Sequence, residues 1–216
     1  HHDDYLDMRG SRVRGSVSCA RSNEARPNPL GDSNKRMCGI AGIFSFDSDA
    51  DPPSWEEAGK ICRRMAARGP DGEAIWQSTD GRMVLGHRRL AVIDPSPDAA
   101  QPMQSPDRRF TISFNGEIYN HAALRSRLEC RGHRFQTRSD TEVMLALFAE
   151  YGEACCAMLE GMYAFAVHDR AAQSLFLARD PYGIKPLYSA RGRGTIQFAS
   201  QSRALGDGRG VDPAGL

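Results

Sequence analysis

The order of the apolar segments limits the fold of this chain more than any other feature of its sequence. Three apolar segments rich in small or branched residues are followed by two segments with helix-capping residues, and then by three more apolar segments. The expected strands cover 38–46, 83–93, 109–114, 162–167, 174–178 and 195–199. The expected helices begin after the capping residues Ser54, Asn120 and Ser139 or Asp140, and run toward Met65, Leu128 and Tyr151. This order predicts an α+β fold with layered sheets rather than alternating β–α–β units.

Composition narrows the classes of function. With 216 residues, of which 40% are hydrophobic, the chain can build one sizeable core. Its 28 Lys and Arg against 27 Asp and Glu give a net charge of +1, which removes the electrostatic case for a nucleic-acid or membrane-surface partner. The longest strongly apolar run, 162–167, is far below the about 20 residues that a membrane span needs. The six cysteines and six histidines show no ligand spacing, so no metal site is expected and the thiols are read as reduced, in a cytoplasmic protein.

The first 37 residues differ from the rest. They carry few large apolar residues and many charged, Gly, Ser and Pro residues. Such a segment cannot bury enough surface to offset its ordering entropy, so residues 1–37 are expected to be a disordered leader, a tag remnant or an upstream extension. An apolar central segment is missing, which excludes a signal peptide.

Cys38 directly follows Met37 and begins the first expected strand. Removal of Met37 would expose a Cys whose own α-amine, with a pKa of about 7.7–8.0, could take the thiol proton without a histidine. While residues 1–37 precede Cys38, its nitrogen is an amide and provides no such base. Taken alone, the Met-Cys pair is a weak signal, and a buried structural cysteine is favoured over a nucleophile.

Six sequence motifs from Met37 onward favour the nucleophile over the structural cysteine. They are MCGIAGIF (37–44), ARGPDG (67–72), GHRRLAVID (86–94), NGEIYNH (115–121), SDTEV (139–143) and RDPYGIKPLY (179–188). In this order they closely resemble the class II glutamine amidotransferase domain of glutamine-dependent asparagine synthetases, from Met37 to about Leu205. The resemblance implies an N-terminal-nucleophile hydrolase fold, an αββα four-layer sandwich with two antiparallel sheets.

The resemblance also implies roles for the matching residues. Cys38 would attack the side-chain amide of glutamine, form a glutamyl thioester and release ammonia. Asn115 and Gly116 would form the oxyanion hole. The remaining implied glutamine-binding residues are Arg89 for the α-carboxylate, backbone groups of Arg89, Leu90, Ala91, Val92 and Ile93, and Glu117 and Asp140 for the α-ammonium.

Each role has a structural alternative. Asn115-Gly116 could be an ordinary Asn-Gly turn, Asp140 a helix N-cap and Glu117 a surface acid. Arg89 could be a solvated strand arginine, although the neighbouring Arg88 is the one expected to fill that role. Two residues of the RGPD turn, Asp71 and Gly72, are expected to be structural loop residues near the site.

The expected organisation is an amidotransferase domain at 38–206, followed at 207–216 by the start of a linker to an absent synthetase domain. The Ser-Gly-Gly-x-Asp-Ser pyrophosphate loop of that domain is missing from the sequence, as is a P-loop. The implied function is hydrolysis of glutamine, with the ammonia passed to an ATP-dependent amidation of aspartate by a synthetase domain or chain in trans. The glutaminase half needs no cofactor, and only the synthetase would need ATP and Mg.

Two other functions stay open at this point. One is a non-catalytic truncated domain with a folding or docking role. The other is a cysteine hydrolase with a Cys-His dyad, for which the sequence offers His87, His121, His133 and His168 but no nucleophile motif. A homodimer is also left open.

Overall fold

The computed structural model describes residues 13–15, 37–90, 99–206 and 211–212. Its strands are β1 (Val13–Gly15), β2 (Gly39–Ser45), β3 (Gly72–Gln77), β4 (Met83–Arg89), β5 (Met103–Gln104), β6 (Phe110–Ile118), β7 (Gly161–Asp169), β8 (Ser174–Arg179), β9 (Tyr188–Arg191), β10 (Thr195–Ala199) and β11 (Val211–Asp212). Its helices are α1 (Trp55–Arg64), α2 (His121–Glu129) and α3 (Asp140–Tyr151), with 3-10 helices η2 (Gly152–Met158) and η3 (Ser202–Leu205).

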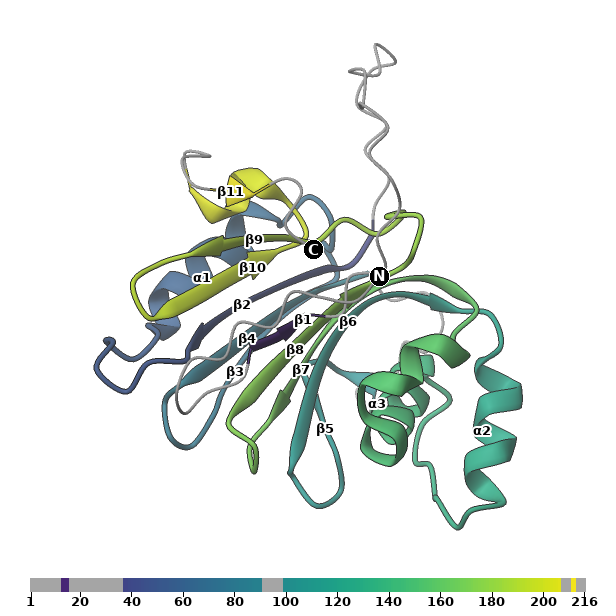
Figure 1. The fold of residues 1–216 in the computed structure, drawn as a ribbon. Helices are drawn as coiled ribbons and strands as arrows, with labels where there is room; N and C mark the ends of the chain where they lie inside the picture. The colour runs from purple at the N-terminus through teal and green to yellow at the C-terminus, as the bar shows by residue number, and fades with distance from the viewer. Residues whose placement is uncertain (1–12, 16–36, 91–98, 207–210, 213–216) are drawn as a thin grey trace.

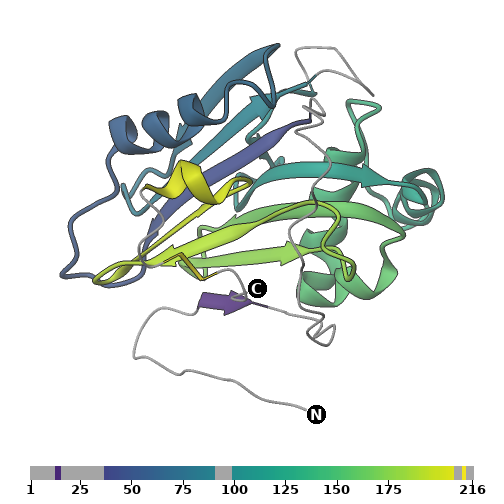
Figure 2. The same cartoon turned by 90° about the horizontal axis from the view of Figure 1, so that it is seen from above.

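The strands form two sheets. Sheet A has the order β1-β8-β7-β6-β5, and sheet B has the order β11-β9-β10-β2-β4-β3. Helix α1 covers the outer face of sheet B, whereas α2 and α3 cover the outer face of sheet A (Figures 1 and 2). This arrangement confirms the predicted α+β four-layer sandwich. The pairings are antiparallel except that β1 runs parallel to β8, with Val13 opposite Leu175. Strand β1 thus departs from the disorder expected for residues 1–37, and the other residues of that segment except Met37 lie outside the described ranges.

Three apolar clusters fill the three spaces between the four layers. Along β2, Ile40 and Phe44 face the inter-sheet core, whereas Ala41 and Ile43 face α1. Along β7, Ala164 and Ala166 face the inter-sheet core, while its odd-numbered residues from 163 to 167 pack toward α2 and α3. Both faces of these strands are buried, which explains why their sequences read as continuous apolar runs rather than as alternating ones.

The caps of the helices agree in part with expectation. The Ser54 hydroxyl accepts a hydrogen bond from the Glu57 N–H, and the Ser139 hydroxyl accepts one from the Thr141 N–H. Asn120 precedes α2 without capping it through its side chain. Its amide instead donates to the Met158 carbonyl and accepts from the Glu160 N–H, which ties the start of α2 to the segment before β7.

The strands differ from expectation in length and number. Strand β6 continues beyond Phe114 to Ile118, because it pairs with β7 along its whole length. Asn115 and Gly116 therefore lie inside a strand, and the alternative of an Asn-Gly turn is wrong. Strands β3, β5 and β9 are not anticipated from the sequence pattern. The expected strand at 83–93 ends as β4 at Arg89, and residues 91–93 lie outside the described ranges.

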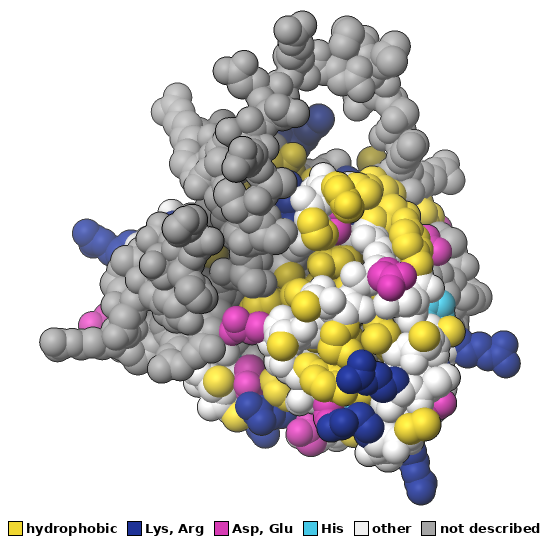
Figure 3. All heavy atoms as spheres, turned by 45° about the vertical axis from the view of Figure 1, so that its right-hand side comes forward, with side chains coloured by type: hydrophobic (Ala, Val, Ile, Leu, Met, Phe, Trp, Pro, Cys, Tyr) yellow, Lys and Arg dark blue, Asp and Glu magenta, His cyan; other side chains and the backbone are white. Residues whose placement is uncertain are grey.

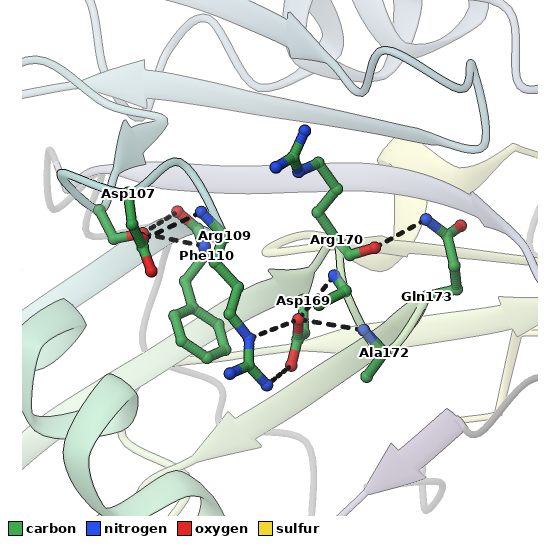
Figure 4. Close-up of polar contacts among 9 residues, drawn as sticks. Asp107, Arg109, Phe110, Asp169, Arg170, Ala172 and Gln173 are labelled. Carbon is green, nitrogen blue, oxygen red and sulfur yellow. Dashed lines mark hydrogen bonds and ion pairs between the residues drawn. The ribbon is translucent and has the colours of Figure 1, made fainter.

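The Asp169 carboxylate connects several segments at the end of sheet A where β6 begins and β7 ends. The Arg109 guanidinium donates two hydrogen bonds to the Asp169 carboxylate, at 3.1 and 2.8 Å. The same carboxylate accepts from the N–H groups of Ala171 and Ala172, as Figure 4 shows. Asp169 therefore joins the start of β6 to the turn between β7 and β8.

The surface carries mixed charges. On the face shown in Figure 3, basic and acidic side chains lie among hydrophobic ones. Within the described ranges, no helix is long and apolar enough to cross a membrane, and no group of three or more His, Cys, Asp or Glu residues could hold a metal ion. The cysteines in these ranges are free thiols.

Candidate active site

A cavity of about 220 Å³ lies where the ends of the two sheets meet. It is smaller than the about 300–1,000 Å³ of pockets for drug-sized ligands, so its size suits a small molecule such as an amino acid. Sheet B contributes Cys38, His87 and Arg89, and sheet A contributes Asn115, Gly116 and Glu117. The other lining residues are Met37, Leu90, Ala99, Gln101, Phe114, Ser139, Asp140, Thr141, Met162 and Lys185.

Cys38 immediately precedes β2 and is placed by neighbouring backbone. Its Sγ accepts a hydrogen bond from the Leu90 N–H at 3.3 Å and lies 3.5 Å from the Leu90 carbonyl. Burial raises the pKa of the thiol, and this rise is opposed by the Leu90 N–H and by the charges of Lys185, Arg89 and Arg68. The thiol is therefore partly buried and close to several cations. Such an electropositive, partly exposed environment is typical of reactive cysteines.

The RGPD turn holds the backbone around Cys38 in place. The Arg68 guanidinium donates to the Cys38 carbonyl at 3.2 Å, and the Arg68 carbonyl accepts from the Met37 N–H at 2.9 Å. Asp71 donates its N–H to the Arg89 carbonyl, and Gly72 pairs with Arg89. These contacts agree with the structural role expected for Asp71 and Gly72. They also show that Arg68, which sequence reasoning left without a role, holds the peptide around Cys38.

Asn115 is buried on the inner face of β6, and its side-chain Nδ2 has no hydrogen-bond partner within the described structure. A buried amide donor without a partner costs about 1–3 kcal/mol, and such groups are rare in folded proteins. The donor also belongs to a residue that lines the cavity with Cys38. Asn115 is therefore a residue of the cavity wall whose amide donor has no partner among the described residues.

Gly116 presents a second donor, as the pairing of β6 shows. Its partner on β7, Tyr163, uses its own N–H and carbonyl to bond Asp180, so the Gly116–Tyr163 pair is a non-hydrogen-bonded one. The Gly116 N–H therefore points to the other edge of β6. A side chain is excluded here, because a Cβ would lie 2.3 Å from the Met162 carbonyl oxygen.

The neighbouring groups on this edge of β6 are already bonded. The Phe114 N–H donates to the Gln101 side chain at 2.6 Å, and the Ile118 N–H donates to the Asp140 carboxylate at 3.2 Å. The Gly116 N–H lies between these two bonded groups and faces the cavity that Gln101 and Asp140 also line.

The first turn of α3 forms another part of the cavity wall. Asp140 is the first residue of α3 and is buried, while Ser139 supplies the N-cap hydroxyl, so the alternative that Asp140 is the cap is wrong. Burial raises the pKa of Asp140, opposed mainly by the hydrogen bond from the Ile118 N–H. Glu117 also lines the cavity but is exposed. Two acidic residues thus line the cavity.

Arg89 lines the cavity from the end of β4, while Arg88 points to the opposite face of sheet B. Arg88 is not solvated as expected: its guanidinium pairs with Glu73 at 2.6 Å and donates to the Gly69 carbonyl. The strand alternation explains the difference, since the outer face of β4 is covered by α1 and the segment that follows it. Leu90 lines the cavity, and Ala91, Val92 and Ile93 lie outside the described residues.

His87 also lines the cavity but is unsuited to be a base for Cys38. Burial lowers its pKa to about 4, and its Nε2 lies 3.2 Å from the Phe114 carbonyl oxygen. Because a carbonyl only accepts, Nε2 carries the proton and is committed to β6. His87 therefore connects the two sheets, which argues against a Cys-His dyad built on this histidine.

Sequence reasoning missed two further residues of the cavity, Gln101 and Lys185. Gln101 bonds both the Phe114 N–H and the Thr141 hydroxyl, and so joins β6 to α3. Lys185 lies within RDPYGIKPLY, and its place in that motif was the available signal.

Comparison with known proteins agrees with this geometry. A family described as the glutamine amidotransferase domain matches residues 37–214. The chain belongs to this family. It is 40% identical over 170 residues to a glutamine-hydrolysing asparagine synthetase of Bacillus subtilis, covering 78% of this chain and 26% of the relative. It is also 40% identical over 172 residues to an asparagine synthetase of Oryza sativa, covering 79% of this chain and 28% of the relative. This amidotransferase domain thus spans about a quarter of the length of these relatives.

The fold of the domain has solved counterparts. The glutamine phosphoribosylpyrophosphate amidotransferase of Bacillus subtilis superposes with a TM-score of 0.66 at 23% identity, over 78% of this chain and 43% of the other. At this identity the likeness concerns the fold alone, and it confirms the predicted N-terminal-nucleophile hydrolase fold.

Proposed function

We propose that this domain hydrolyses glutamine to glutamate and ammonia, with Cys38 as the nucleophile. The observation that carries the proposal is the pair of donors on β6, the Asn115 side-chain amide, which has no partner among the described residues, and the Gly116 N–H, on residues that line one cavity with Cys38. Two converging donors beside a nucleophile are the arrangement that stabilises the oxyanion of an acyl-transfer reaction.

The proposed reaction has two stages. Once Cys38 is N-terminal, its α-amine takes the thiol proton, and Sγ attacks the side-chain amide carbon of glutamine. The oxyanion is held by Asn115 and Gly116, and the proton passes to the leaving nitrogen as ammonia departs. Water then hydrolyses the thioester, with the amine as base, to give glutamate and the free thiol.

The two ends of the substrate's backbone match the charges of the cavity. The Arg89 guanidinium suits the α-carboxylate, because its fork can bond both oxygens. Asp140 and Glu117 suit the α-ammonium. Because Asp140 already accepts from Ile118, the ammonium would bind next to β6 and direct the substrate amide toward Gly116.

We further propose that the ammonia serves an ATP-dependent synthetase of the kind found in the longer relatives. Exposed aromatic and aliphatic side chains support a partner surface near the cavity: Tyr119 follows the end of β6, and Tyr182 and Ile184 precede Lys185. ATP and Mg would act in that partner, with aspartate as the acceptor. A homodimer and a cytoplasmic location stay predictions.

The test compares two forms of the chain, one beginning at Cys38 and one retaining residues 1–37, with the N-terminus of each confirmed by intact mass. We expect glutamate and ammonia release from the first form only, and its loss in Cys38→Ala. A chain beginning at Cys38 that folds but releases no ammonia would contradict the proposal and favour the non-catalytic alternative. Equal activity of both forms would remove the amine from the mechanism.

A further inference from the structure

Lys185 places a buried positive charge at the nucleophile. Only 7% of the residue is exposed, and its Nζ lies 3.3 Å from the Sδ of Met37, the residue next to Cys38. Both Lys185 and Cys38 line the cavity. Burying an ammonium group costs free energy unless the charge is paired or hydrogen-bonded. A buried lysine at this position is therefore a candidate for a specific role.

The segment that carries Lys185 is fixed by one carboxylate. Asp180, which is 1% exposed, accepts hydrogen bonds from the N–H groups of Tyr182, Ile184 and Lys185 itself, at 2.9 to 3.1 Å. It also accepts from the Tyr163 N–H on β7. Asp180 thereby anchors the Lys185 backbone to sheet A, opposite the Cys38 end of sheet B. The position of the ammonium is set by the fold rather than by a mobile surface loop.

We propose that Lys185 is a positioning residue that tunes the nucleophile: its charge favours the thiolate of Cys38 and the neutral form of the α-amine that serves as base. This inference rests on the proposed function and extends it. An ammonium close to the thiol stabilises the negative thiolate, and it disfavours a second positive charge on the amine. Both effects bring the nucleophile and its base into their reactive forms at neutral pH.

The charges that face this pair come from several elements. Arg68 from the RGPD turn, Glu117 from β6 and Asp180 act on Lys185, while Arg68, Arg89 and Lys185 act on Cys38. Of the three cations, Lys185 lowers the pKa of the Cys38 thiol most, while Arg68 also donates to the Cys38 carbonyl and Arg89 would pair with a bound α-carboxylate.

The experiment measures the rate of Cys38 alkylation by iodoacetamide against pH, in chains beginning at Cys38 and without glutamine. We expect Lys185→Met and Lys185→Gln each to raise the midpoint of this pH profile by about one pH unit. The fraction of Cys38 present as reactive thiolate at neutral pH would then be tenfold smaller. Lys185→Arg should keep the midpoint near that of the unchanged protein. The acidic limb of kcat/KM for glutamine should shift in the same direction, while activity recovers at high pH.

Two controls separate charge tuning from damage to the fold. Lys60→Met removes an exposed charge on α1 and should leave the midpoint unchanged. Cys130, an exposed thiol in the same molecule, should keep its alkylation profile in every variant. An unchanged Cys38 midpoint in both neutral variants would overturn the inference, whatever happens to turnover. A raised midpoint without any turnover in the unchanged protein would uphold it and count against the proposed glutaminase instead.

Discussion

Replacing Asn115 by Ala should lower the kcat for glutamine hydrolysis but change the free energy of unfolding little. The variant loses one of the two proposed oxyanion donors, which typically costs about 2.7–4 kcal/mol of transition-state stabilisation, or 10²–10³ in kcat. The KM for glutamine should change little, because the donor acts on charge that develops in the transition state. The cost to folding should be small, because Nδ2 is buried without a partner among the described residues, and such a group already costs about 1–3 kcal/mol. This gain offsets the packing lost with the side chain.

The assay measures glutamate release under steady-state conditions and the free energy of unfolding in urea for the same samples. Asn120→Ala provides a matched control with the opposite expectation. Its side chain makes two hydrogen bonds, to Met158 and Glu160, and does not line the cavity. It should lose about 1–2 kcal/mol of stability and keep its kcat. An Asn115→Ala protein with a kcat within about threefold of the unchanged chain would refute the oxyanion reasoning.

Three further predictions concern other parts of the molecule. Arg89→Ala should raise the KM for glutamine tenfold or more, on the order of one lost charge-assisted contact, with a smaller effect on kcat; unaltered saturation would exclude the carboxylate role. His168 is buried between Phe44 and Trp76 without a ring-nitrogen partner in the described residues, and burial lowers its pKa from 6.5. Its contribution to stability is therefore complete above about pH 6.5 and is lost as the pH falls, so His168→Phe should show a smaller loss of unfolding free energy between pH 7 and pH 5. Asp169→Ala should lower the free energy of unfolding by about 1–3 kcal/mol, because its carboxylate also binds two backbone N–H groups. Arg109→Ala should lower it by less than about 1 kcal/mol, because the guanidinium is half exposed. Equal losses in the urea titrations would contradict this ranking.

The layered fold could be predicted from the sequence because its strongest signals are local. The continuous apolar run after Cys38 reflects a strand buried on both faces, and Ser54 and Ser139 cap their helices as their sequence context indicates. The less regular strands were missed for a physical reason. Strand β3 is formed by Gly72–Gln77, whose Gly, Ala and Glu have low strand propensity, so its formation depends on pairing with β4.

The site could be predicted only in part, because some of its determinants are long-range. Motifs identified several of the residues that line the cavity, including Cys38, Asn115 and Asp140. That Asn115 lies in a strand rather than in a turn depends on the partner β7, which begins more than 40 residues later in the chain. The contacts of Arg88, Gln101 and Lys185 join elements distant in sequence, and no local pattern carries that information.

The residues of the candidate site come from both sheets, so the distances between them depend on how the two sheets are held against each other. The proposed nucleophile, Cys38, immediately precedes β2 of sheet B, whereas both proposed oxyanion donors lie on β6 in sheet A. Two hydrogen bonds cross from β4 to β6 near the cavity: the Ser113 hydroxyl donates to the Gly86 carbonyl at 3.1 Å, and His87 donates to the Phe114 carbonyl at 3.2 Å. Both are buried, so water does not compete for them, and each fixes the register of one sheet on the other. The distance from the Cys38 thiol to the two proposed oxyanion donors therefore depends on buried polar contacts as well as on apolar packing, which specifies a unique arrangement less strictly.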